Sequence, residues 1–342
     1  MLTFDVAMPI ALFAVTLVAI LLNKRIESKL KTTFEEREFR MRDAILFVVV
    51  ISVAVSVIVF VPQMAITMVF LFSYSTLLFV FSYIFSGIRK RSAQLFCLGL
   101  GLTALIVGTV ALLDPLADSW MFYGGLATYG LAAFAFFAIL YEQMRKSSGK
   151  RWYLAVLPPA LFLLLYLFYR GTPLWFPYFF NIFAITFAIL ITLYLASLFT
   201  WKIVFIFAGL LTVMDIILVF GTGTMGEAAT TLFALGLPIA VVLPRIPIQG
   251  AIVFGGLGLG DFFFAGILGT QTYKKFGEKT AVISALVMAI SLGIFYAIQL
   301  YFEIMFFPAT VNIICGWLPV VAWKMLSERK QKQQESREIN QK

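Results

Sequence analysis

The sequence contains no histidine at all. An HExxH zinc site, a Ser-His dyad and a Cys-His dyad each need an imidazole as a ligand or a base, so these three chemistries are excluded. Carboxylates are therefore the expected agents of any acid–base reaction near neutral pH. The only two cysteines, Cys97 and Cys315, lie in different apolar segments, which is typical of buried small hydrophobic residues. No metal ion and no cofactor are expected.

Charged residues are also scarce. They make up 13% of the 342 residues, whereas 62% are hydrophobic. One soluble core cannot hide so much apolar surface, and several runs are long enough to cross a bilayer. We therefore predict an all-α polytopic membrane protein whose surroundings are the lipid bilayer. The net charge of +9 does not indicate nucleic-acid binding, because the basic residues are confined to short connectors and the tail.

Eleven apolar runs are predicted to be membrane spans. They are Val6–Leu22, Ala44–Val61, Met64–Ser86, Leu95–Leu113, Met121–Leu140, Leu154–Tyr169, Phe176–Phe199, Ile203–Phe220, Ala251–Leu268, Ala281–Leu300 and Ile304–Trp323. If the amino terminus lies outside, 24 of the 26 lysines and arginines face the cytoplasm, and only Arg170 and Arg245 lie outside. This asymmetry predicts an outer amino terminus and a cytoplasmic carboxyl terminus.

The division by role follows from these runs. Residues 1–202 are predicted to be amino-terminal scaffold helices with seven spans, 203–323 the helices that carry the chemistry, and 324–342 a loose, basic cytoplasmic tail. No N-glycosylation sequon and no organelle retrieval signal occur, which favours the cell membrane of a prokaryote. The sequence does not indicate an oligomeric state.

Two aspartates, Asp215 and Asp261, lie well inside apolar runs, where a carboxylate costs a few kcal/mol. They lie on consecutive runs, which are usually neighbours in space. Two carboxylates within hydrogen-bonding reach do not easily both ionise, so one keeps a proton while the other acts as a base on a water between them. That arrangement hydrolyses amides without a metal. The alternative is a proton or sodium site in a transporter.

The residues around the aspartates suggest how a substrate would be held. Gly258 and Gly260 lack side chains and permit close approach of another backbone. The connector Leu237–Pro247 contains three prolines, which disfavour a continuous helix, and a β-branched run that suits a short extended segment. Such a segment can hold an unwound peptide by edge pairing. The alternative is an apolar loop packed at the membrane surface.

Taken together and in order, these motifs resemble the presenilin and signal-peptide-peptidase family of intramembrane aspartyl proteases. The resemblance rests on Met214-Asp215, the Leu-Pro-rich connector, Gly258-Leu259-Gly260-Asp261 and Pro308-Ala309. It covers roughly 203–323. It implies a presenilin-like bundle of about nine to eleven transmembrane helices and an aspartic endopeptidase that cleaves transmembrane peptides or signal peptides. The orientation predicted from the charge count is similar to that of signal peptide peptidase and opposite to that of presenilin.

The resemblance also implies roles for single residues. Asp215 and Asp261 would be the catalytic pair, Gly258, Leu259 and Gly260 the remainder of the GxGD motif, and Leu237, Pro238, Pro308, Ala309 and Thr310 substrate-binding elements. Met214 stands where many members have tyrosine, and Thr310 replaces a leucine. The family typically has nine spans with the aspartates on the sixth and seventh, whereas here they fall on the eighth and ninth. Either two spans are extra at the amino end or the segmentation differs there.

Three rival readings stay open at this point. The first is a cation-coupled transporter that uses the aspartates as an ion site. The second is a prepilin-type peptidase, which is disfavoured because Asp215 is followed by Ile216-Ile217-Leu218 rather than by basic residues. The third is a catalytically inactive relative that binds membrane helices.

Overall fold

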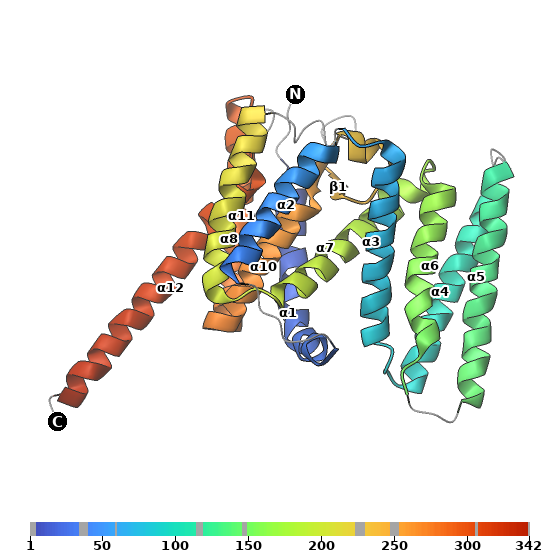
Figure 1. The fold of residues 1–342 in the computed structure, drawn as a ribbon, viewed down its shortest axis with the longest axis horizontal. Helices are drawn as coiled ribbons and strands as arrows, with labels where there is room; N and C mark the ends of the chain where they lie inside the picture. Colours follow the sequence, from blue (N-terminus) through green and yellow to red (C-terminus); the bar gives the residue numbers. More distant parts are fainter. Residues whose placement is uncertain are drawn as a thin grey trace. The chain divides into compact units, whose positions relative to one another are not determined.

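The computed structural model describes residues 5–33, 40–58, 60–113, 119–145, 149–222, 230–246, 253–304 and 307–340. Helices dominate it, as Figure 1 shows, and the protein is an all-α polytopic membrane protein. The helices are α1 (Ala7–Thr33), α2 (Met41–Ile58), α3 (Gln63–Ile84), α4 (Lys90–Leu113), α5 (Ser119–Met144), α6 (Trp152–Tyr169), α7 (Phe180–Ala196), α8 (Trp201–Ile216), α10 (Leu259–Phe276), α11 (Glu278–Tyr301) and α12 (Ala309–Asn340). Two π-helical stretches, η1 (Leu174–Phe179) and η2 (Ile217–Thr222), precede α7 and follow α8.

Within the described residues, eight helical segments are long and apolar enough to cross a membrane. They are Gln63–Ile84, Lys90–Leu113, Ser119–Met144, Trp152–Tyr169, Leu174–Ala196, Trp201–Gly221, Glu278–Tyr301 and Ala309–Gln331, and Ala7–Asn23 is a shorter apolar helical segment. Eight of the predicted runs coincide with these segments. Large apolar side chains such as Phe72 and Leu95 are 75% and 67% exposed, as expected where lipid replaces water.

One predicted span is wrong. The run Ala251–Leu268 is not a single helix, because strand β2 (Phe254–Gly258) comes first and α10 begins only at Leu259. Ala251 itself lies outside the described residues. The reason is local: glycine is about 1 kcal/mol less favourable than alanine in a helix, and three of the five residues of β2 are glycine. The run therefore pairs as a strand.

The predicted loose tail is also wrong over most of its length. Helix α12 continues past Trp323 to Asn340. Lysine, glutamate, glutamine and arginine dominate this stretch, and all four are good helix formers, so polarity alone does not end the helix. In the same way α1 continues beyond Leu22 through charged residues as far as Thr33.

The two strands form an antiparallel hairpin. Strand β1 (Ala240–Pro244) pairs with β2 in the register Ala240↔Gly258 to Pro244↔Phe254. Two further hydrogen bonds lengthen the ladder: Arg245 donates its N–H to the Val253 carbonyl at 2.8 Å, and Leu259 donates to Ile239 at 2.9 Å. The extended segment predicted within the proline-rich connector is thus confirmed for β1. Pro247 lies outside the described residues.

The chain divides into two compact units. One unit comprises residues 1–60, 184–231 and 239–342, and the other comprises 61–183 and 232–238. In the first unit α10 packs against α1, α8, α11 and α12, so α10 is its central helix. In the second unit α4 packs on α5 and α3 packs on α6. These two units are defined by contacts between residues. The predicted boundary between residues 202 and 203 separated scaffold helices from the helices that carry the chemistry, and that division stays a prediction.

The second unit contains a buried ion pair between α5 and the start of α6. Glu142 is 2% exposed and Arg151 is 5% exposed. Arg151 Nε donates to Glu142 Oε1 at 2.7 Å, and the Tyr153 hydroxyl donates to Oε2 at 2.5 Å. The backbone N–H of Arg151 donates to the Ser86 carbonyl at 3.3 Å. A buried carboxylate with these partners is a structural clamp, because its charge is fully paired.

Candidate active site

Asp215 is the last residue but one of α8, immediately before η2, and its side chain is buried, with the residue 6% exposed. Its Oδ2 accepts a hydrogen bond from the Thr310 hydroxyl at 2.6 Å and another from the Thr310 backbone N–H at 3.4 Å. Thr310 is the second residue of α12, so the carboxylate lies at the amino-terminal end of that helix. The unsatisfied N–H groups and the positive end of the helix dipole stabilise a negative charge there.

Asp261 lies in the first turn of α10, whose N-cap residue is Gly258. Its carboxyl group accepts a hydrogen bond from the backbone N–H of Gly258. A methyl group placed on Gly258 would lie 3.3 Å from Asp261 Oδ2, so the carboxylate folds back over the glycine. This is the contact that a capping acid makes at the third position of a helix. The sequence reading, which placed Asp261 deep inside a span, is therefore corrected: it caps a helix.

Asp215 and Asp261 lie within electrostatic range of each other. They come from α8 and α10, which pack against each other and against α12. Each carboxylate lies at a helix amino terminus, which offsets part of the cost of two negative charges in one apolar unit. The site therefore offers two coupled carboxyl groups and the hydroxyl of Thr310.

Of the other predicted site residues, some lie beside the aspartates and some do not. Gly258, Leu259 and Gly260 form the start of α10, while Pro308 and Ala309 lead into the turn that carries Thr310. Leu237 and Pro238 belong to the second unit, where the Tyr74 hydroxyl donates to the Pro238 carbonyl at 3.3 Å. Their predicted role in substrate binding stays a prediction.

Met214 precedes the first aspartate and contacts α2. The Ser52 hydroxyl donates a hydrogen bond to the Met214 sulfur. Near this contact, Phe47 of α2 packs against Phe207 of α8 and Phe263 of α10, with ring centroids 6.0 Å and 6.4 Å apart. These aromatic contacts join the helices that carry Asp215 and Asp261.

Three candidate functional residues were not among the site residues predicted from the sequence. Asp5 is 5% exposed and lies beside Gly255 of β2, as does Arg245. Tyr296 of α11 is within electrostatic range of Asp5, Arg245 and Asp261. The signal that could have found one of them was the charge asymmetry, because Arg245 is one of the two basic residues that the predicted orientation leaves on the outer side.

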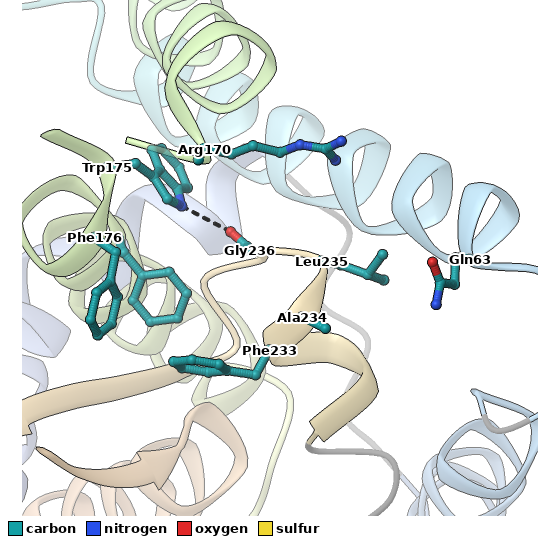
Figure 2. A pocket seen from close by; sticks show the side chains of 10 residues that line it. Gln63, Arg170, Trp175, Phe176, Phe233, Ala234, Leu235 and Gly236 are labelled. Carbon is teal, nitrogen blue, oxygen red and sulfur yellow. Dashed lines mark hydrogen bonds between the residues drawn. The ribbon is translucent and has the colours of Figure 1, made fainter. Parts of the chain in front are cut away.

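Among the described residues, no group of three or more Asp, Glu, Cys or His side chains is arranged to hold a metal ion. The second unit contains a cavity of about 350 Å³. Neither aspartate lines this cavity, because both belong to the first unit. Aromatic side chains and Arg170 line it (Figure 2), and the Trp175 indole donates to the Gly236 carbonyl at 2.9 Å across one wall.

Comparison with known proteins gives no family for the chain. No protein-family model matches it, and no curated protein or solved structure matches it either. The resemblance to the presenilin and signal-peptide-peptidase family therefore rests on the sequence motifs and on the arrangement of the residues that carry them.

Proposed function

We propose that the protein is an intramembrane aspartyl endopeptidase. The observation that carries the proposal is that Asp215 and Asp261 lie on α8 and α10, two helices that pack against each other, and are within electrostatic range of one another. A second support is the hairpin that leads directly into Asp261. Its substrates would be single transmembrane segments, including signal peptides, in the cell membrane of a prokaryote.

The chemistry needs one proton shared between the two acids. The ionised carboxylate takes a proton from a water molecule, and the resulting hydroxide attacks the peptide carbonyl carbon. The protonated carboxyl group donates its proton to the carbonyl oxygen, which gives a tetrahedral diol. The first carboxyl group then gives the proton that it took from water to the amide nitrogen, the C–N bond breaks, and a hydroxyl proton of the diol returns to the second carboxylate, which leaves an amine and a carboxylic acid. Thr310 and the Gly258 N–H orient the two carboxylates by donating to them.

The hairpin supplies a place for an unwound substrate. Hydrogen-bonded and non-hydrogen-bonded pairs alternate along an antiparallel ladder. Since Arg245 pairs with Val253 and Leu259 with Ile239 by hydrogen bonds, Gly256 and Gly258 direct their backbone groups toward the outer edge of β2. Gly256 is exposed. The N–H of Gly258 on this edge already meets the Asp261 carboxylate, so a peptide added to the edge would run straight to that acid.

The outer edge of β1 is less suited to the same task. Pro244 has no N–H to offer. Beyond it, the Ile246 carbonyl already accepts a hydrogen bond from the Val6 N–H at 3.1 Å. The edge beside Asp261 is therefore the better docking strand.

The charge asymmetry sets the direction of the substrate. With the amino terminus outside, β2 lies toward the outer face and α10 runs inward from it. A segment with a cytoplasmic amino terminus would run outward and would lie antiparallel to β2, the more stable of the two pairings. Such substrates have the orientation of signal peptides.

Replacement of either aspartate tests the function. In liposomes that contain a fluorescent transmembrane reporter, Asp215→Ala and Asp261→Ala are expected to abolish cleavage while the helical circular dichroism is retained. The matched control is Asp43→Ala, because this acid lies in the first turn of α2, where it accepts a hydrogen bond from the Arg40 N–H at 2.9 Å. Cleavage by either site variant at the unmodified rate would refute the proposal.

A cation-coupled transporter is the second candidate, favoured by one observation. Two carboxylates and the Thr310 hydroxyl form an oxygen-only set, which suits a proton or a sodium ion. Ion uptake by the same liposomes that is lost in Asp215→Ala, without any reporter cleavage by the unmodified protein, would favour this reading. Tight reporter binding with neither activity would favour an inactive relative.

A further inference from the structure

The cavity of the second unit lies at one end of its membrane-spanning helices. It is lined by the first residue of the span Gln63–Ile84, by the two residues that follow the span Trp152–Tyr169, and by the beginning of the span Leu174–Ala196. Three spans therefore have an end at one cavity, which places it at the level where the hydrocarbon core of a bilayer meets the phospholipid headgroups. Its volume of about 350 Å³ is within the range of small-molecule sites, about 300–1,000 Å³.

Three phenylalanine rings form the apolar side of the cavity. The ring centroid of Phe176 lies 5.7 Å from that of Phe180 and 5.8 Å from that of Phe233, and the centroids of Phe180 and Phe233 are 5.7 Å apart. Phe233 is 44% exposed, so this ring still has apolar surface to offer. The aromatic triangle is thus a surface on which a hydrocarbon chain can pack.

Arg170 and Gln63 form the polar side of the cavity. Figure 2 shows both side chains apart from Phe176 and Phe233, and both residues are exposed. The guanidinium group lies over the Tyr166 ring, 5.7 Å from its centroid. Arg170 makes no ion pair with any residue that the structure describes. Its positive charge is therefore available to an anionic ligand.

Hydrogen bonds hold one wall of the cavity in place. The Trp175 indole donates to the Gly236 carbonyl at 2.9 Å, and the Tyr166 hydroxyl donates to the Leu235 carbonyl at 2.8 Å. Gly236 has a φ of +66°, a left-handed conformation that glycine adopts without strain. A methyl group at this position would lie 3.6 Å from Arg170 Cβ, so the bend brings the backbone against the arginine. The wall is ordered before a ligand arrives, which lowers the entropic cost of binding.

The position of Arg170 is unusual for a basic residue of this chain. The predicted orientation puts 24 of the 26 lysines and arginines on the cytoplasmic side and leaves Arg170 on the outer side. A guanidinium group forms bidentate, charge-assisted hydrogen bonds with a phosphate group. A free phosphate would use only the polar side of the cavity, and an uncharged apolar molecule would use only the aromatic triangle. A phosphate that carries a hydrocarbon chain uses both.

We propose that this cavity binds an anionic phospholipid of the outer leaflet. The lipid phosphate pairs with Arg170 and accepts a hydrogen bond from the Gln63 amide, while the upper part of one acyl chain packs on the aromatic triangle. A headgroup with an ammonium group of its own would bring a second positive charge beside the guanidinium group, so a zwitterionic lipid binds less tightly. The site contains neither aspartate, and the proposal does not depend on the peptidase function.

Photo-crosslinking with two lipid probes tests the proposal. Phosphatidylglycerol and phosphatidylcholine, each with the same diazirine in the upper part of one acyl chain, are added in small amounts to phosphatidylcholine liposomes that contain the full-length protein. After irradiation, mass spectrometry of peptides locates the crosslinks. We expect about tenfold more crosslinking at the aromatic triangle with the phosphatidylglycerol probe than with the phosphatidylcholine probe. Crosslinks elsewhere in the same sample serve as the internal reference.

Arg170→Gln should reduce crosslinking of the anionic probe at the triangle to the level of the zwitterionic probe. Lys150→Gln is the matched control and should leave the preference unchanged. The Lys150 ammonium group also lies over a tyrosine, 4.4 Å from the ring centroid of Tyr83, which is at the opposite end of α3 from Gln63. A general attraction of anionic lipid to basic residues would be weakened by both variants, whereas the proposed site is weakened by one.

Three outcomes would overturn the proposal. The first is equal crosslinking of the two probes at the triangle of the unmodified protein, a comparison that requires no variant to fold. The second is a preference for the anionic probe that survives Arg170→Gln. The third is loss of the crosslinks when soluble glycerophosphoglycerol is added at the concentration of the probe, because the site would then bind a free phosphate ester as well as it binds a lipid.

Discussion

At the scale of single residues, the site depends on positions where a hydrogen atom stands in place of a side chain. Gly258 accommodates the Asp261 carboxylate, and Gly255 accommodates Asp5 and Arg245. Gly260 belongs to the same motif, yet nothing lies within 4 Å of the methyl group that alanine would add there. The two glycines of the GxGD motif therefore have different reasons to be small.

We predict that Gly258→Ala lowers kcat by about tenfold or more and leaves stability nearly unchanged. Its backbone, with φ −63° and ψ 150°, is accessible to alanine, whereas the new methyl group 3.3 Å from Oδ2 displaces the carboxylate. Gly260→Ala is the matched control and should keep activity and slightly raise the unfolding temperature, because alanine favours the helix. Reporter cleavage and thermal unfolding measure both effects, and equal activity of the two variants would contradict the prediction.

Sequence reasoning found the residues that are unusual by themselves. Asp215 and Asp261 stood out because charges are rare in apolar runs. Asp5 and Tyr296 did not stand out, because an acid before a first span and a tyrosine within a later one are ordinary. These two residues come within electrostatic range of each other only where α1 and α11 pack together, and no local pattern in the sequence encodes that packing. Thr310 was singled out by the resemblance, and its bond to Asp215 required the structure.

At the scale of elements, the sequence predicted one of the two strands of the hairpin. The prolines and β-branched residues indicated β1 correctly. Strand β2 was predicted to be part of a membrane span, because a glycine-rich apolar run has the hydropathy of a membrane helix. Such a run nevertheless has a low propensity to form a helix. Hydropathy measures only the free energy of transfer to lipid. It does not include the backbone hydrogen bonds by which β2 pairs with β1.

We predict that Gly256→Pro raises KM strongly, because proline removes the N–H that faces the outer edge of β2. Val242, its partner on β1, occupies a pair without direct hydrogen bonds, so the hairpin itself keeps its ladder. Gly256→Ala is the control at the same position. Its methyl group meets Val242 Cγ2 at an ordinary 3.6 Å, and the N–H is retained. Steady-state kinetics with the membrane reporter distinguish the two, and a KM unchanged by proline would refute edge pairing.

At the scale of the whole molecule, eight of the eleven predicted runs coincide with membrane-length helices among the described residues. The grouping of these helices into two units was not predictable, because it depends on which faces pack. The first unit joins the beginning, the middle and the end of the chain, so the chemistry-bearing helices rest on α1 and α2 as well.

We predict that the carboxyl terminus is cytoplasmic, as the concentration of 24 basic residues on that side requires. Single cysteines introduced near Gln334 in α12, in a variant in which Cys97 and Cys315 are serine, should react with an impermeant maleimide only after the cells are opened. A cysteine at Ile246, on the hairpin side, should react in intact cells. The reverse pattern would invert the substrate direction proposed for β2.

The bond between Val6 and Ile246 has a consequence for biosynthesis. Val6 leaves the ribosome early, whereas Ile246 is added only after most of the chain exists. The Val6 N–H therefore has to remain without this hydrogen-bond partner when α1 is synthesised, and the candidate site forms only after most of the chain has been translated. A nascent chain arrested before the hairpin consequently lacks β2 and α10, and contains only one of the two aspartates of the candidate site.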